Sequence, residues 1–215
     1  MDPARDPRDI DLPVAQTALL FVDMQAAWCE PAPPGSGRRT AGHPFHARLR
    51  NVVLPNQQRL LALARRLGID VLHTVIEALT LDGRDISLDH RLSGILIPKG
   101  SPGARILPEL QPAPNEIVLA KSSSGVFNST AIDYVLRNLG TRRLVVAGVF
   151  TDQCVDMAVR DAADRGYHVT LVEDACAADS DERHAAALRV LRGYAWVTDT
   201  ATLVARLGGD GSSGA

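Results

Sequence analysis

The chain has 215 residues, of which 46% are hydrophobic and 22% charged, with a formal net charge of −2. This length suits one domain with a substantial core, and the near-neutral charge gives no reason to expect a nucleic acid or a membrane as partner. No apolar run reaches the roughly 18 residues of a membrane-spanning helix, and the charged, Pro-rich start is unlike a signal peptide.

The chain has three cysteines, an odd number that lie far apart. This pattern favours neither a disulfide framework nor a zinc site. We therefore expect a reducing, cytoplasmic setting, in which a single special thiol can do chemistry.

Strand-like and helix-like segments alternate along the chain. The predicted strands are Thr17–Val22, Asp70–Val75, Glu116–Leu119, Arg143–Ala147, His168–Val172 and Ala195–Val197. The predicted helices are Asn51–Leu67, Ser129–Leu139, Thr151–Arg165, Asp181–Leu191 and Ala201–Leu207, with Gly68, Gly140 and Gly166 as C-terminal caps. Such alternation predicts an α/β fold of three layers, α/β/α, around a central, mainly parallel sheet of six strands.

The predicted domain spans residues 15–207, between a loose leader over 1–14 and a flexible Gly/Ser-rich tail over 208–215. Within it, two long irregular stretches interrupt the alternation, Pro31–His46 and Glu77–Pro102. Loops this long are uncommon in a compact domain and often act as lids. We expect both to roof a small pocket.

Two charged residues end predicted strands. Asp23 follows Thr17–Val22, and Lys121 follows the run from Glu116 to Ala120. Ligands bind at the carboxyl ends of strands in open parallel sheets, where a poorly solvated carboxylate readily accepts a proton. Taken singly, a capping role for Asp23 and a surface position for Lys121 are the more ordinary interpretations.

Cys154 lies just after the fourth predicted strand, at the start of a predicted helix that Thr151 is placed to cap. The positive end of a helix dipole favours a nucleophilic thiolate, and the free amides of that turn can hold an oxyanion. A buried structural cysteine is the ordinary alternative, which we favour for Cys29 and Cys176. Together, the carboxylate, ammonium and thiol provide a base, an electrostatic activator and a nucleophile.

Three segments carry a family resemblance: Leu20–Gln25, Lys121–Phe127 and Gly148–Val155. They resemble the signature blocks of the isochorismatase-like hydrolases, a superfamily with a Rossmann-like fold that includes nicotinamidases, N-carbamoylsarcosine amidases, biuret hydrolases and ureidoacrylate amidohydrolases. The similarity runs from Thr17 to about Leu207, with the blocks in the right order and spacing.

This resemblance implies a catalytic triad of Asp23, Lys121 and Cys154. It also implies a cis peptide bond between Val149 and Phe150, beside Thr151, with the amides of Phe150 and Cys154 aimed at one oxyanion.

This sequence differs from two groups of the superfamily, the nicotinamidases and the vinyl-ether-cleaving isochorismatases, and both differences narrow the expected chemistry. Nicotinamidases of the superfamily hold a metal with an Asp and clustered histidines after the second strand. Here His73 lies inside that strand and His90 is distant, so we expect structural histidines, no metal and no other cofactor. Isochorismatases that cleave a vinyl ether generally lack the cysteine, so its presence favours C–N bond hydrolysis.

We therefore expect an amidohydrolase that cleaves a small amide, ureido or carbamoyl substrate through a thioester, in a homodimer or homotetramer. Phe127 and Phe150 are candidates to stack on a planar substrate, and Gln25, Glu77 and Asn128 to bond its polar edge. The alternatives are vinyl-ether hydrolysis with Asp23 as the acid, a silent binding module, and a redox role for Cys154 with Cys176 as the resolving thiol.

Overall fold

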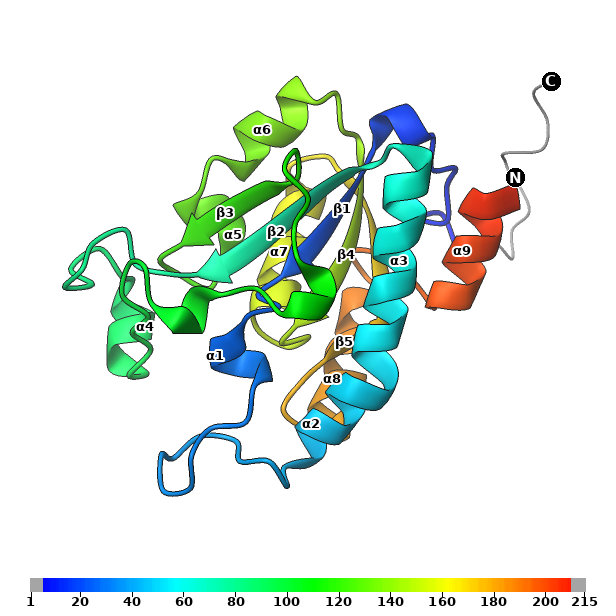
Figure 1. The fold of residues 1–215 in the computed structure, drawn as a ribbon. Helices are drawn as coiled ribbons and strands as arrows, with labels where there is room; N and C mark the ends of the chain where they lie inside the picture. Colours follow the sequence, from blue (N-terminus) through cyan, green and yellow to red (C-terminus); the bar gives the residue numbers. More distant parts are fainter. Residues whose placement is uncertain (1–5, 210–215) are drawn as a thin grey trace.

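A computed structural model of the chain describes residues 6–209, and its six strands form one parallel sheet of order β3-β2-β1-β4-β5-β6 (Figure 1). The strands are β1 (Thr17–Val22), β2 (Asp70–Ile76), β3 (Ile117–Lys121), β4 (Arg143–Val149), β5 (His168–Ala177) and β6 (Trp196–Thr198). The predicted fold class is confirmed.

The helices that follow the strands are α1 (Ala26–Cys29), α2 (Pro44–Arg48), α3 (Leu54–Leu67), α4 (Leu88–Leu92), α5 (Val126–Ser129), α6 (Ile132–Asn138), α7 (Cys154–Asp164), α8 (Asp181–Leu191) and α9 (Thr200–Gly209). Four short helical turns join them: η1 (Val14–Gln16), η2 (Leu49–Val53), η3 (Pro102–Ala104) and η4 (Pro108–Leu110). None of the helices between residues 6 and 209 is long and apolar enough to cross a membrane.

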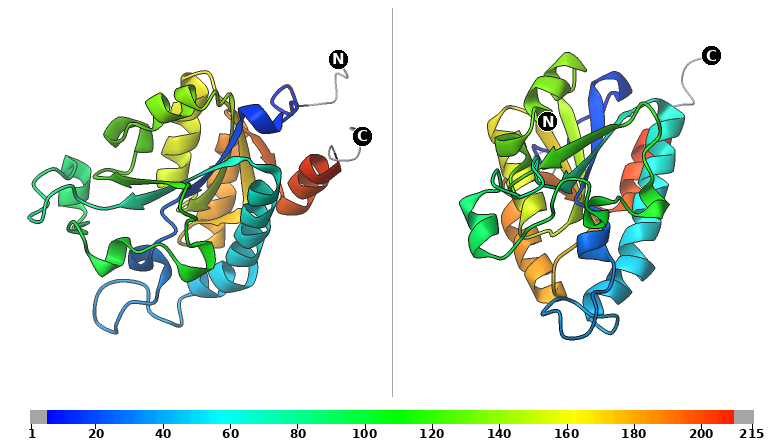
Figure 2. Two further views of the ribbon diagram at one scale, coloured as in Figure 1. Left: turned by 45° about the horizontal axis from the view of Figure 1, so that its top comes forward. Right: turned by 60° about the vertical axis from the view of Figure 1, so that its left-hand side comes forward.

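Side chains alternate between the two faces of the sheet and build two cores. On β1, Leu19 and Phe21 pack with α3 and α9, whereas Leu20 and Val22 pack with α5, α6, α7 and α8. Figure 2 shows these two helical layers with the sheet between them. Every residue of β1 is buried, which explains why the strand reads as a continuous apolar run.

The strand order reverses between β1 and β4. From β1 the chain adds β2 and β3 on one side, and it later adds β4, β5 and β6 on the other. Val22, at the end of β1, pairs with Thr74 of β2 and with Gly148 of β4. Loops leave such a switch point in opposite directions, which opens a crevice for a ligand at the carboxyl edge.

Several boundaries differ from the predicted ones. The helix expected over Asn51–Leu67 is continuous with α2 through a π-helical turn, Leu49–Val53. The helix expected over Ser129–Leu139 is shorter, α6 (Ile132–Asn138), and Ser129 instead ends the separate helix α5. The three capping glycines are confirmed, with positive φ angles at Gly68, Gly140 and Gly166.

Parts of the expected leader and tail lie within the described residues. In the expected loose leader, Leu12 is buried in the core. In the expected tail, Gly208 and Gly209 belong to α9, and the rest of it lies outside the described residues.

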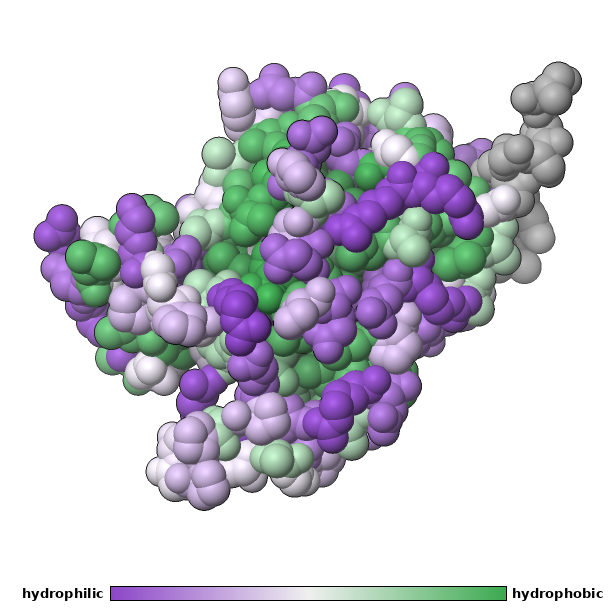
Figure 3. Space-filling model, in the orientation of Figure 1, coloured by the Kyte–Doolittle hydropathy of each residue, from purple (hydrophilic) through white to green (hydrophobic). Residues whose placement is uncertain are grey.

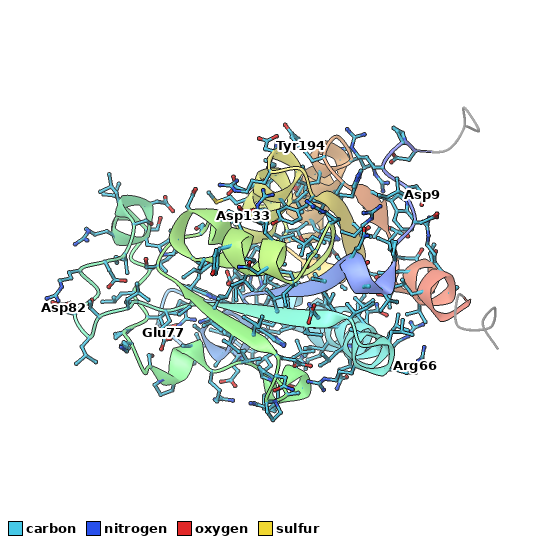
Figure 4. All side chains as sticks on the ribbon, turned by 90° about the horizontal axis from the view of Figure 1, so that it is seen from above. Asp9, Arg66, Glu77, Asp82, Asp133 and Tyr194 are labelled. Carbon is cyan, nitrogen blue, oxygen red and sulfur yellow. The ribbon has the colours of Figure 1, made fainter. Side chains whose placement is uncertain are left out.

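The irregular stretch from Glu77 to Pro102 contains α4 and projects from the carboxyl edge of β2. Figure 4 places Glu77 at the base of this projection and Asp82 near its tip. Leu81, Leu88 and Leu92 are each at least 70% exposed there, and hydrophobic patches are visible on this part of the surface (Figure 3).

Candidate active site

Asp23 is the first residue after β1 and is 1% exposed. Its φ of 53° is left-handed, a conformation that aspartate tolerates better than most side chains. The Asp23 amide donates to the carbonyl of Thr74 (3.1 Å), and the Thr74 hydroxyl donates to Oδ1 of Asp23 (2.8 Å). β2 therefore fixes the carboxylate at the end of its neighbour.

Lys121, the last residue of β3, is fully buried. Its Nζ lies 2.9 Å from Oδ2 of Asp23 and donates to Sγ of Cys154 at 3.4 Å. It also donates to the carbonyls of Ser123 (3.0 Å) and Ser124 (3.1 Å). Burial is the largest single influence on the pKa of Lys121 and would lower it, but the charges and hydrogen bonds of Asp23 and Cys154 together outweigh burial, so the pKa is raised and the ammonium stays charged.

Cys154 is the first residue of α7 and is 5% exposed. Burial and, after it, the charge of Asp23 raise the pKa of its thiol to about 12, although the charge of Lys121 opposes them. The direction is opposite to the lowering of this pKa that we expected from the helix terminus. Because Asp23 and Lys121 already neutralise each other, a thiolate would add an unmatched buried charge. The resting site holds a thiol beside a carboxylate–ammonium pair.

The turn before Cys154 is shaped by close contact with β1. Gly148 has φ +139°, and a Cβ there would lie 2.2 Å from the carbonyl oxygen of Val22. Only glycine fits this position. The Val149–Phe150 peptide bond is cis. Within residues 6–209, the amides of Phe150 and Cys154 have no hydrogen-bond acceptor, so both are available to a ligand.

Thr151 does not cap α7, contrary to the prediction. The residue before the helix is Gln153, and no side chain caps it. Instead, the hydroxyl of Thr151 lies 2.8 Å from Nδ1 of His184, whose Nε2 lies 3.0 Å from Nη2 of Arg48. Arginine can only donate, so Nε2 accepts and the Nδ1–H donates to Thr151. Burial, aided by Arg48, lowers the pKa of His184 to about 4, which keeps the ring neutral.

A cavity of about 30 Å³ lies against Asp23 and Cys154. The sequence-predicted residues in its wall are Asp23, Val149, Phe150 and Cys154. The wall also contains residues that the sequence reasoning missed: Trp28, Ile76, Ile95, Ser124 and Gln153. Ser124 belongs to the serine run after Lys121, and Gln153 directly precedes the cysteine, so proximity to the motifs is the signal that would have found them. No local pattern marks Ile95.

Gln25 and Glu77 are held by protein contacts away from this cavity. Nε2 of the Gln25 side chain donates to the carbonyls of Ile76 (3.0 Å) and Gly103 (2.9 Å), and its Oε1 accepts from the backbone amide of Ile76 (2.6 Å). Glu77 accepts from the amide of Gly100 at 2.8 Å. Both anchor the Glu77–Pro102 stretch, and their positions do not support the substrate contacts expected from the sequence.

Phe127 and Asn128 also lie outside the cavity wall. The Phe127 ring packs at 6.1 Å from that of Tyr167 and under the guanidinium of Arg165, on the α5–α7 side of the sheet. Asn128 is exposed. Neither position supports a stacking or polar contact with a ligand beside Cys154.

The histidines take structural positions. Nε2 of His73 lies 3.4 Å from Glu116, at the far end of the β2–β3 pair. Nε2 of His90 lies 3.1 Å from the hydroxyl of Ser124, and burial lowers the pKa of His90. In the described part of the chain, no group of three or more His, Cys, Asp or Glu side chains is arranged to hold a metal.

Comparison with known sequences places this site in a family. A sequence profile of the isochorismatase domain matches residues 17–202. The chain belongs to the isochorismatase family. The resemblance of its three motifs to these hydrolases is thereby confirmed.

Individual relatives of this isochorismatase-family chain cover nearly all of it. The ureidoacrylate amidohydrolase RutB of Acinetobacter baylyi is 30% identical over 93% of this chain and 86% of its own length. An isochorismatase family protein from Desulfovibrio vulgaris superposes with a TM-score of 0.74 at 29% identity, covering 90% of this chain and 98% of the other. N-carbamoylsarcosine amidase from Thermoplasma acidophilum gives 0.68 at 26% identity, covering 86% and 96%.

Proposed function

We propose that the chain is a cysteine hydrolase that cleaves a C–N bond of a small amide, ureido or carbamoyl compound through a thioester. The observation that carries the proposal is the position of Lys121 Nζ, which contacts both Oδ2 of Asp23 (2.9 Å) and Sγ of Cys154 (3.4 Å). A thiol, a base and a fixed cation at one strand edge suit nucleophilic acyl transfer.

In the first half-reaction, Asp23 takes the proton of the Cys154 thiol as sulfur attacks the carbonyl carbon. The raised pKa of Cys154 makes this transfer concerted with attack, since a free thiolate is unfavourable beside Asp23. Once Asp23 is protonated, Lys121 is left to balance the negative charge that moves onto the sulfur and the substrate. The protonated Asp23 then gives its proton to the departing nitrogen, and the C–N bond breaks.

In the second half-reaction, Asp23 removes a proton from water, which attacks the thioester carbonyl. The C–S bond breaks, the acid leaves and the thiol regains its proton. The unpaired amides of Phe150 and Cys154 are the donors for the oxyanion in both halves. These steps use only residues of this chain.

The size of the cavity supports a small reacting group. A space of about 30 Å³ beside Cys154 accepts little more than a carbonyl with one amino substituent. The names of two relatives, ureidoacrylate amidohydrolase and N-carbamoylsarcosine amidase, support the same choice of substrate class.

A panel of simple amides and ureido compounds, assayed for ammonia, tests the proposal, with Cys154→Ala as the inactive control. Ammonia release by the wild type alone supports it, and it should persist after treatment with a chelator. Pyruvate release from an isochorismate-like ether, retained by Cys154→Ala, would contradict it. Activity that a chelator abolishes and zinc or iron restores would show that a metal takes part.

We further propose a cytoplasmic homodimer or homotetramer. The support is the group of exposed leucines on the α4 projection, Leu81, Leu88 and Leu92, since apolar patches on soluble proteins commonly mark interfaces. Sedimentation of the wild type and of a Leu88→Glu/Leu92→Glu variant tests this. A wild type that sediments as a monomer contradicts it.

A further inference from the structure

A second, larger cavity lies directly outside the one beside Cys154. Its volume is about 520 Å³, and it shares Trp28 and Ile95 with the inner cavity. Its walls come from both irregular stretches, with Gly37–Thr40 on one side and Ser93–Ile97 on the other. A substrate whose carbonyl reaches Cys154 therefore extends its other end into this outer cavity.

Two adjacent arginines line the outer cavity. The guanidinium carbon of Arg39 lies 4.3 Å from the ring centre of Phe150 and 5.0 Å from that of Phe45. Nε of Arg39 donates to Asp179 at 2.5 Å. These contacts hold the guanidinium of Arg39 beside Phe150, in the turn before Cys154. The two terminal nitrogens of Arg39, Nη1 and Nη2, have no hydrogen-bond acceptor within residues 6–209.

Arg38 lies over Trp28, with its guanidinium carbon 5.6 Å from the ring centre. None of the carboxylates in the described part of the chain pairs with it. Since Asp179 is the only acidic residue in the described wall, the two arginines leave an excess of positive charge.

The indole of Trp28 adds an unused donor between the two cavities. Its Nε1–H is buried and has no acceptor among residues 6–209. Buried donors are rarely left unpaired, so this group is suited to an oxygen of a ligand. A cationic wall, a fixed guanidinium and a free N–H together match a carboxylate, which arginine binds through two parallel hydrogen bonds.

We propose that Arg38, Arg39 and Trp28 form a carboxylate subsite, so that the substrate is a ureido or N-carbamoyl acid and not a neutral amide. This inference rests on the proposed hydrolysis and adds the substrate class. Arg38 is the specificity residue, because its charge is uncompensated, whereas Arg39 also supports Phe150.

A matched pair of probes tests the subsite: 3-ureidopropanoate and the neutral 1-(3-hydroxypropyl)urea. Ammonia release is measured with the wild type, with Arg38→Gln, and with Arg59→Gln, which removes an exposed arginine on α3 outside both cavities. We expect Arg38→Gln to lower kcat/KM for the acid by about 10- to 100-fold, as for loss of hydrogen bonds to a charged group. Its kcat/KM for the neutral compound should not change, and Arg59→Gln should match the wild type with both.

A second measurement does not require turnover. Iodoacetamide alkylation of Cys154, followed by peptide mass spectrometry, is slowed by any compound that occupies the site. The acid should protect at lower concentration than the alcohol, and Arg38→Gln should remove this difference. Equal protection and equal kcat/KM for both compounds, unchanged in Arg38→Gln, would overturn the subsite while leaving the hydrolysis standing. Arginine-dependent protection without ammonia release would overturn the hydrolysis and leave the subsite standing.

Discussion

Nζ of Lys121 lies 3.4 Å from Sγ of Cys154, although the two residues come from strand β3 and helix α7 on opposite sides of the central strand β1. The same Nζ atom also forms an ion pair with Oδ2 of Asp23 at 2.9 Å. The ammonium therefore contacts both the proposed nucleophile and its proposed base, and we expect its loss to affect stability as well as chemistry.

Lys121→Met should abolish turnover and lower the free energy of unfolding by about 3–5 kcal/mol, because it leaves Asp23 as a buried charge without a partner. The double variant Asp23→Asn/Lys121→Met removes both charges and should recover much of that stability, without activity. Urea unfolding of the three proteins measures the effect. A single variant as stable as the wild type would mean that the pair is not buried as described.

Gly148→Ala should be more damaging than an alanine at another glycine with positive φ. Both Gly148 and Gly166 have positive φ, but only Gly148 faces backbone atoms, and a Cβ at Gly166 meets nothing within 4 Å. We expect Gly166→Ala to cost about 1–2 kcal/mol from backbone conformation. Gly148→Ala should lower the free energy of unfolding by about 1–3 kcal/mol more than Gly166→Ala does, and should displace the turn before Cys154. Equal melting temperatures for the two variants would contradict the close approach to Val22.

Thr151→Val should leave the Nδ1–H of His184 buried without an acceptor, at a cost of about 1–3 kcal/mol. Because Thr151 lies in the turn that presents Phe150 and Cys154, turnover should fall as well. Thr151→Ser keeps the hydroxyl and serves as the control, with both properties close to the wild type. Melting temperature and turnover are measured on the same preparations, and a Thr151→Val protein indistinguishable from Thr151→Ser would show that the bond to His184 has no role.

The charge state of His184 predicts how stability changes with pH. Its pKa is lowered from 6.5 to about 4 in the folded protein, so between these values the unfolded chain binds more protons. The stability that the neutral ring contributes is therefore present above pH 6.5 and is lost as the pH falls towards 4. The loss is at most about 3 kcal/mol.

Urea unfolding of the wild type and of His184→Gln at pH 7.5 and pH 4.5 measures this contribution. The wild type should lose more stability than the variant between the two pH values. Equal losses would show that His184 is already protonated, or exposed, in the folded protein.

The sequence was sufficient to predict the clustering of Asp23, Lys121 and Cys154, because each lies at or just after the carboxyl end of a strand and parallel strands end at one edge of the sheet. This clustering depends on residues that are close to strand ends, where sequence patterns are most informative.

Contacts between distant segments were not predictable. Thr151 precedes the helix in a sequence pattern typical of a cap, yet its hydroxyl bonds to His184, 33 residues away. Gln25 follows the first motif, but its amide is used by the backbone of Ile76 and Gly103. We expected the helix terminus to lower the pKa of Cys154, whereas burial and the charge of Asp23 raise it, and burial depends on the whole fold.

The proposed mechanism requires Cys154 to form a covalent thioester during C–N bond cleavage. The decisive measurement is rapid quenching of the wild type with an amide or ureido substrate that releases ammonia, followed by intact-protein and peptide mass spectrometry. We expect an adduct equal in mass to the acyl part of the substrate, located on Cys154, sensitive to hydroxylamine and absent from Cys154→Ala. Turnover with no adduct on Cys154, and a Cys154→Ala protein that still releases ammonia, would contradict it.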